Sequence, residues 1–243
     1  MEKKSFRNIH IACYDTDEAS VLKPATFMDY AQDLAGDNSD MLGFGYSDLI
    51  AHNWVWVISR MKMVFHRLPK WSEDVILSTW HRGPDGPFYI RDYRMTDKDG
   101  NDLVCATSSW IILDIEERKV VKSEFGTAPE TICEDFAVEK ACQRLRLPKW
   151  VRTEEKYTHT VVYSDIDRNR HANNAMYMVW AMDALDRSFL AAHPVREAEI
   201  DFVREAMPGE TVTLSVGKDE ISGAWYVAGA VGDAQSFLVR FVF

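Results

Sequence analysis

The chain has 243 residues, of which 47% are hydrophobic and 12% aromatic, which is enough for one large domain or two small ones with packed cores. The formal net charge of −10 argues against general nucleic-acid binding. No apolar run has the length of a membrane span, and residues 1–6 have neither the apolar segment of a signal peptide nor an Arg/Ser-rich transit segment. We therefore expect a cytoplasmic protein.

The four cysteines have neither the Cys-x-x-Cys spacing nor the neighbouring histidines that are typical of zinc sites. They are Cys13, Cys105, Cys133 and Cys142. We expect reduced thiols, no bound metal and no cofactor.

In the first half, alternating apolar residues predict a strand at residues 6–13, followed by a helix from Pro24 to about residue 34 with the proline in its first turn. Residues 43–54 indicate a loop or a second short helix. Further strands are expected at 55–65, 74–80, 88–95 and 103–113, the last two joined by a turn at 97–101.

Residues 114–153 are charged and lack a clear core pattern, which predicts a linker with some helix. Alternation resumes at residues 157–163, and a dense polar turn follows at residues 165–174. Asn173 or Asn174 is a natural N-cap for a helix whose apolar positions continue to Phe189. Several strands complete the chain.

The second half repeats the first. With a shift of 150 residues Asp17 falls on Asp167, and with a shift of 137 Glu73 falls on Glu210, so the first half carries 13 additional residues after its helix. This unit of one helix and several antiparallel strands predicts an α+β fold. We place an N-terminal domain at 1–120, a linker at 121–154 and a C-terminal domain at 155–243.

The two halves differ where chemistry is possible. The second half has polar side chains at three positions where the first is apolar: Asn169 for Ala19, His171 for Val21 and Glu205 for Leu68. A turn with only a structural role has little reason for this asymmetry. We therefore expect the site in the second half.

The stretch Asp-x-Asn-x-His-x-Asn-Asn at residues 167–174 resembles a motif of the acyl-acyl-carrier-protein thioesterases, and the chain is identified as similar to the bacterial type. Residues 202–205, Phe-Val-Arg-Glu, resemble a second motif of this family, and residues 53–61 with Trp71 and Trp80 are similar to its N-terminal half. The resemblance implies a double hotdog, in which two antiparallel sheets each wrap around a long helix. It also implies release of free fatty acid from acyl carrier protein, which ends chain elongation in fatty acid biosynthesis.

Plant members of that family carry Cys directly after the Glu, whereas this chain has Ala206. Any mechanism that needs that thiol is therefore excluded here. A thioester has a thiol leaving group with an ordinary pKa near ~8.5, so the reaction mainly needs an activated nucleophile and a stabilised oxyanion.

These demands suggest roles for four residues. We expect His171 or Glu205 to activate a water, and Asp167 to orient Asn169 and His171. Asn169 and the backbone N–H groups of the helix start would then hold the carbonyl oxygen. Direct attack by a carboxylate stays open as an alternative.

Two further sets of residues are candidates for substrate contacts. Lys140, Arg144, Arg146, Lys149 and Arg152 form a basic stretch that suggests a dock for an acidic carrier protein bearing an acyl-phosphopantetheine, or else a solvated linker face. Phe27, Met28, Trp54 and Trp56 suggest an acyl tunnel or ordinary core, and Asn173 and Asn174 suggest further substrate contacts. A homodimer is an additional expectation.

Other function classes stay open from sequence alone. One is a hotdog acyl-CoA thioesterase or acyl hydratase, and another is a non-catalytic protein that binds acyl thioesters. The GxSxG, P-loop, GxGxxG and HExxH motifs are absent, which disfavours serine-hydrolase, nucleotide-binding and zinc-protease functions. Asn169, His171 and Glu205 together favour an enzyme over a sensor.

Overall fold

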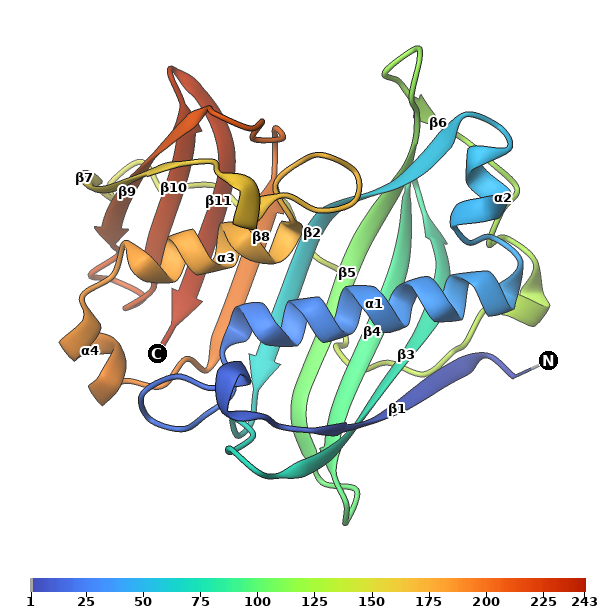
Figure 1. The fold of residues 1–243 in the computed structure, drawn as a ribbon, viewed down its shortest axis with the longest axis horizontal. Helices are drawn as coiled ribbons and strands as arrows, with labels where there is room; N and C mark the ends of the chain where they lie inside the picture. Colours follow the sequence, from blue (N-terminus) through green and yellow to red (C-terminus); the bar gives the residue numbers. More distant parts are fainter. Residues whose placement is uncertain (1) are drawn as a thin grey trace. The chain divides into compact units, whose positions relative to one another are not determined.

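The computed structural model describes residues 2–243. It consists of two compact units, each with an antiparallel sheet and a helix that lies across it (Figure 1). The first unit comprises the chain up to Lys23 and Phe27–Cys142, and the second comprises Pro24–Thr26 and Gln143–Phe243.

The first unit has its strands in the order β1-β3-β4-β5-β2, with the short β6 paired to β5. Its elements are β1 Lys4–His10, α1 Pro24–Leu42, α2 Tyr46–Ile50, β2 Trp54–Phe65, β3 Asp74–Asp85, β4 Phe88–Asp97, β5 Asp102–Asp114 and β6 Val120–Val121. Helix α1 crosses β3, β4 and β5 (Figure 1). The turn between β4 and β5 is closed by Asp97, whose Oδ1 accepts the N–H groups of Asp99 and Asn101, as the sequence predicts.

The second unit has its strands in the order β8-β11-β10-β9-β7. Its elements are β7 Glu154–Thr160, α3 Asn174–Asp183, α4 Arg187–Ala192, β8 Glu197–Phe202, β9 Thr211–Lys218, β10 Trp225–Val231 and β11 Ala234–Val242. The Tyr177 ring of α3 meets Phe202 of β8 and Phe237 of β11 edge-on, with ring centroids 5.5 and 5.3 Å apart. Helix α3 therefore packs on its sheet through aromatic contacts.

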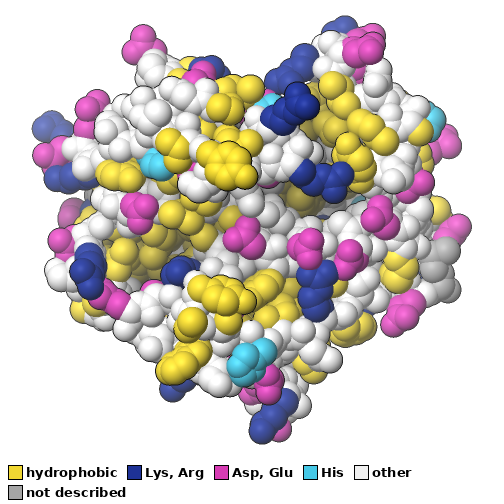
Figure 2. Space-filling model, in the orientation of Figure 1, with side chains coloured by type: hydrophobic (Ala, Val, Ile, Leu, Met, Phe, Trp, Pro, Cys, Tyr) yellow, Lys and Arg dark blue, Asp and Glu magenta, His cyan; other side chains and the backbone are white. Residues whose placement is uncertain are grey.

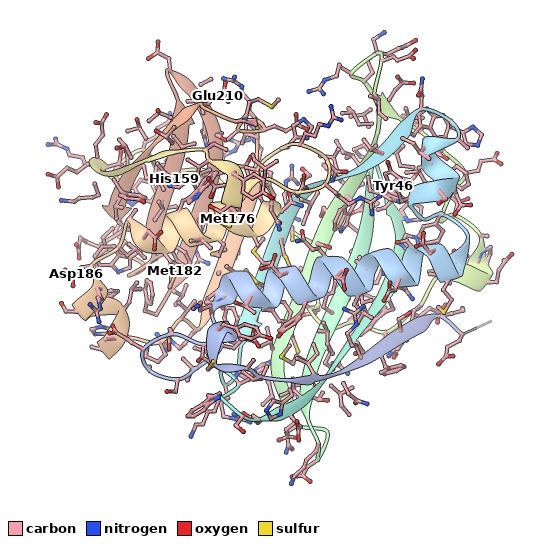
Figure 3. All side chains as sticks on the ribbon, viewed as in Figure 1. Tyr46, His159, Met176, Met182, Asp186 and Glu210 are labelled. Atoms are coloured by element: carbon pink, nitrogen blue, oxygen red, sulfur yellow. The ribbon has the colours of Figure 1, made fainter. Side chains whose placement is uncertain are left out.

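The strand orders of the two units correspond element by element, which confirms the predicted two-fold repeat. The correspondence extends to the turn before each helix. Ser20 and Arg170, related by the shift of 150, both take left-handed backbone conformations with φ of 60° and 67°. The Arg67–Glu73 ion pair of the first unit likewise recurs as Arg204–Glu210 in the second, where Figure 3 labels Glu210.

Helix α1 is longer than predicted, because it continues past residue 34 to Leu42 and ends at Gly43, whose φ is 80°. The additional turns are rich in polar residues. Asn38 Oδ1 and Ser39 Oγ accept hydrogen bonds from the buried Arg91 guanidinium of β4, at 2.6 and 2.8 Å. The extra turns therefore satisfy a buried cation.

The predicted continuous helix to Phe189 is wrong, because α3 ends at Asp183 and a separate helix, α4, begins at Arg187. Asp186 caps α4, and its Oδ1 accepts the Phe189 N–H at 2.8 Å. The linker prediction is only partly right, since residues 114–153 contain strand β6 and a 3₁₀ turn at Pro129–Thr131 but no α-helix within the chain the structure describes.

Candidate active site

The polar turn before α3 is built around Asp167. Its Oδ1 accepts the backbone N–H of Asn169 at 2.8 Å and that of His171 at 3.4 Å, and its Oδ2 accepts the Asn169 side-chain amide at 3.2 Å. The Asp167 N–H closes the turn by donating to the His171 carbonyl at 2.9 Å. Asp167 thus orients the Asn169 side chain directly, whereas it reaches His171 through the backbone.

His171 and Glu205 come from separate loops and face each other. His171 Nε2 lies 3.6 Å from Glu205 Oε2, and the two side chains are 31% and 34% exposed. This distance is too long for a hydrogen bond, but it leaves an imidazole and a carboxylate converging on one partly open position. The structure therefore brings together the two side chains that the repeat comparison selects.

The start of α3 lies directly after this turn. Asn173 is its N-cap, as predicted, and Asn173 Oδ1 accepts the Ala175 N–H at 3.1 Å. The Met176 N–H donates to the Asn173 carbonyl at 2.9 Å. These two N–H groups of the first turn are thus already engaged within the protein. The exposed Asn169 amide donates one hydrogen to Asp167 and has a second N–H for another acceptor.

Two supporting residues of the site were not assigned a role from the sequence. The buried Asp165 accepts hydrogen bonds from the Val162 N–H at 2.7 Å and from His159, which Figure 3 labels, at 2.8 Å. The His159 ring stacks on Trp180 of α3. In the first unit the equivalent Asp15 is held by the Ala12 N–H and the Tyr30 hydroxyl. The shift of 150 already aligns Asp15 with Asp165 in the sequence. Both carboxylates stabilise the turn before the helix of their unit.

The four acyl-tunnel candidates lie in two places along α1. Phe27 and Met28 are buried near its first turn. Trp56 lies beyond its other end, where its indole N–H donates to the Phe44 carbonyl at 2.9 Å, and Trp54 packs in the same apolar cluster. Leu42 follows Met28 by fourteen residue steps along α1, or about 20 Å of helix axis, so a lining that uses all four would have to run along α1.

The five basic residues from Lys140 to Arg152 are all exposed. Arg144 and Arg146 line an open pocket of about 330 Å³ in the second unit, together with Asp201, Val203 and Gln235. The Asp201 carboxylate accepts the Leu145 N–H at 2.9 Å, which fixes this part of the segment against β8. Figure 2 shows acidic side chains scattered over the visible face, with Lys and Arg side chains among them. The net charge of −10 is therefore not spread evenly.

Within residues 2–243, no group of three or more His, Cys, Asp or Glu side chains is arranged to hold a metal ion. No helix in this part of the chain is long and apolar enough to cross a membrane. All four cysteines are free thiols.

Two tandem units of antiparallel strands, each with a helix across the strands, define the double hotdog class of α+β fold. The family models agree with this class, since the acyl-ACP thioesterase N-terminal domain matches residues 2–126 and the C-terminal domain of the same family matches residues 149–231. The chain therefore belongs to the acyl-ACP thioesterase family.

Individual relatives are distant. An oleoyl-acyl carrier protein thioesterase of Coriandrum sativum is 23% identical over 247 residues, covering 93% of this chain and 66% of the relative. A palmitoyl-acyl carrier protein thioesterase of Gossypium hirsutum is 24% identical over 225 residues, covering 82% and 51%. The chain thus spans about half to two thirds of the length of these plant relatives.

Solved structures show the same fold over nearly the whole chain. An acyl-ACP thioesterase from Bacteroides thetaiotaomicron has a TM-score of 0.88 at 23% identity, with 99% of this chain and 97% of that chain covered. A 12:0-ACP thioesterase from Umbellularia californica has a TM-score of 0.81 at 19% identity, with 98% and 96% covered.

Proposed function

We propose that this protein hydrolyses the thioester of fatty acyl-acyl carrier protein, which releases free fatty acid and ends chain elongation. The observation that carries the proposal is the asymmetry between two otherwise equivalent turns. Only the turn of the second unit has a side-chain amide at Asn169 and an imidazole at His171, which lies 3.6 Å from the Glu205 carboxylate. Membership of the acyl-ACP thioesterase family supports the same reaction.

In this mechanism a water is the nucleophile. Its oxygen bonds to the thioester carbonyl carbon while His171 or Glu205 takes one of its protons, and the Asn169 amide donates to the carbonyl oxygen as negative charge develops there. The tetrahedral intermediate then breaks its carbon–sulfur bond, and the same base returns the proton to the sulfur. Attack by the Glu205 carboxylate itself is the alternative route, and it would pass through an anhydride that water then cleaves.

The carrier protein is the proposed partner, and the basic segment from Lys140 to Arg152 is its proposed dock. Five exposed cations in this segment offer an acidic carrier a complementary surface, and the pocket beside Arg144 and Arg146 offers room for a phosphate-bearing arm. None of these five cations pairs with a carboxylate among the residues described. Their charge is therefore available to a partner.

A substrate panel tests the reaction. Acyl-carrier-protein and acyl-CoA substrates of matched chain lengths would be compared by release of free thiol, with Glu205→Gln as the inactive reference. We expect turnover that favours the carrier-protein substrates. Preference for acyl-CoA would instead indicate the acyl-CoA thioesterase alternative, and binding without turnover would indicate the sensor.

The docking proposal has its own test. The double variant Arg144→Glu/Arg146→Glu should raise KM for the carrier-protein substrate while leaving kcat, and should leave hydrolysis of acyl-pantetheine unchanged. Lys98→Glu, in an exposed turn of the first unit, is the matched charge-reversal control. Equal effects on both substrates would contradict docking through this segment. A cytoplasmic location and a homodimer stay predictions from the sequence.

A further inference from the structure

The backbone of Ala206, the residue that follows Glu205, is held at both of its polar groups. Its N–H donates to the Tyr177 hydroxyl of α3 at 2.8 Å, and its carbonyl accepts the N–H of Ala172, the residue after His171, at 3.3 Å. Ala206 is fully buried, so neither group has water as an alternative partner. The backbone of Ala206 therefore links the Glu205 loop to α3 through its N–H and to the His171 turn through its carbonyl.

In the first unit, the position equivalent to Ala206 needs no hydroxyl partner. At the shifts that define the repeat, Tyr177 corresponds to Phe27 and Ala206 corresponds to Pro69. Proline has no backbone N–H, so no hydrogen-bond acceptor is needed from the phenylalanine at this position. The carbonyl contact is kept, since the Pro69 carbonyl accepts the Leu22 N–H at 2.8 Å. The hydroxyl and the N–H thus occur together in the half that carries Glu205, and both are missing in the half that carries Leu68.

The Tyr177 side chain is well suited to fix a position. It is only 3% exposed, and its ring is held between Phe202, Phe237 and Trp180. Burial, as the main cause, raises the pKa of Tyr177 to about 12, and the nearby Glu205 charge acts in the same direction. The hydroxyl therefore stays protonated at neutral pH and serves as a neutral acceptor for the Ala206 N–H.

We propose that Tyr177 is a positioning residue, which holds the Glu205 carboxylate opposite His171 through the Ala206 N–H. The inference rests on the proposed function, because it assumes that Glu205 and His171 act together on the thioester. A side chain on an irregular loop keeps a reacting geometry only when its backbone is fixed by neighbouring groups. Tyr177 supplies that support from a helix rather than from the loop itself.

The first unit provides the design of the test. Tyr177→Phe leaves the Ala206 N–H without a partner, and we expect kcat for an acyl-carrier-protein substrate to fall by about 10-fold or more while KM changes little. The double variant Tyr177→Phe/Ala206→Pro reproduces the Phe27–Pro69 pair of the first unit and removes the unpaired N–H. We expect it to recover kcat to within about threefold of the original protein. Val212→Ala, in the buried core of β9, is the control for lost stability alone, and should lower Tm without changing kcat.

Several outcomes overturn the inference. If Glu205→Gln abolishes turnover but Tyr177→Phe keeps kcat within about twofold, the proposed function stands and the positioning role is wrong. Failure of a folded double variant to recover activity would mean that the hydroxyl acts in some way other than through the Ala206 N–H. If the double variant does not fold, hydrogen exchange at the Ala206 amide decides: lost protection in Tyr177→Phe supports the role, and unchanged protection excludes it. Full activity of Glu205→Gln would remove the premise that Glu205 takes part and would overturn the inference, whereas no turnover of any acyl-carrier-protein substrate by the original protein would refute the proposed function itself.

Discussion

Asp17 and Asp167 form the same turn in the two units. Asp17 Oδ1 accepts the backbone N–H groups of Ala19 and Val21 at 2.9 and 3.2 Å. Asp167 Oδ1 accepts the equivalent N–H groups of Asn169 and His171 at 2.8 and 3.4 Å. The one added contact of Asp167 is the Asn169 side-chain amide. The two carboxylates therefore make the same backbone hydrogen bonds. A difference in enzyme activity between variants at the two positions would reflect the catalytic role of Asp167.

We predict that Asp17→Ala and Asp167→Ala cost similar stability, about 0.5–2 kcal/mol each, because each loses the same two backbone hydrogen bonds. Only Asp167→Ala should also lower kcat/KM, by on the order of 100-fold, because it releases the Asn169 amide and loosens the turn of His171. Urea unfolding and steady-state hydrolysis of an acyl-carrier-protein substrate measure the two effects. Equal losses of activity in two folded variants would contradict a single active half.

His171 and Glu205 should behave as one unit. We predict that His171→Ala and Glu205→Ala each lower kcat/KM by about 100-fold or more, and that the double variant is little worse than either single one. The reason is that removing either partner of a convergent acid–base pair already disables the proton transfer. Circular dichroism should confirm that all three variants are folded. Additive losses would show that the two groups act independently.

Much of the fold could be predicted because its determinants are local and occur twice. Aspartates at the same positions of both turns, alternating strands and the polar turn at Asp97 each leave a signature within a few residues. The same comparison selected His171 and Glu205, because each replaces an apolar residue of the first half. Because the chain contains an internal repeat, the first half could be compared with the second to identify residues that differ. A single sequence without a repeat does not allow such a comparison.

The missed features depend on contacts that are distant in sequence. The predicted helix ends near residue 34, whereas α1 continues through Asn38 and Ser39, which ordinarily favour caps and turns. Their hydrogen bonds to the buried Arg91 of β4 stabilise them inside the helix. The bond between the Tyr177 hydroxyl and the Ala206 N–H joins residues 29 positions apart. The sequence alone shows neither which polar side chains a buried cation contacts nor which buried backbone N–H needs a hydrogen-bond acceptor.

Ala206→Cys should leave activity within a few-fold of the original protein. The position is fully buried, so a thiol there would be shielded from the substrate, and burial in apolar surroundings raises a thiol pKa. A mechanism that already runs through His171 and Glu205 also gains no missing group. Kinetics with an acyl-carrier-protein substrate provide the check, and a large gain in rate would indicate that this chain has lost a thiol-dependent step.

Acyl chain length should be controlled by the first unit. We predict that Trp56→Leu shifts the product profile toward longer acids and that Met28→Trp shifts it toward shorter ones, because each changes the volume beside α1. Trp225→Leu, in β10 of the second unit, should leave the profile unchanged. The measurement is the fatty-acid profile released from a mixed acyl-carrier-protein pool. If all three variants leave the profile as it was, the first unit does not set chain length.

His81 should make the first unit sensitive to acid. It is 2% exposed on β3, and its Nε2 donates to the Gly126 carbonyl at 2.7 Å. Burial, followed by the charge of Arg91, lowers the pKa of His81 from 6.5 to about 4. The folded protein therefore resists a proton that the unfolded chain accepts below about pH 6.5.

The contribution of His81 to stability is thus fully present above about pH 6.5, and is lost as the pH falls from there to about 4. The full loss is about 3 kcal/mol, of which about 2 kcal/mol falls between about pH 7.5 and about pH 5. We predict that His81→Gln, which keeps a donor for Gly126, lowers stability at neutral pH but flattens its decrease with acid. Exposed His66→Gln is the control and should keep the original slope. Urea unfolding at both pH values measures the difference, and an unchanged slope in His81→Gln would assign the acid sensitivity to other groups.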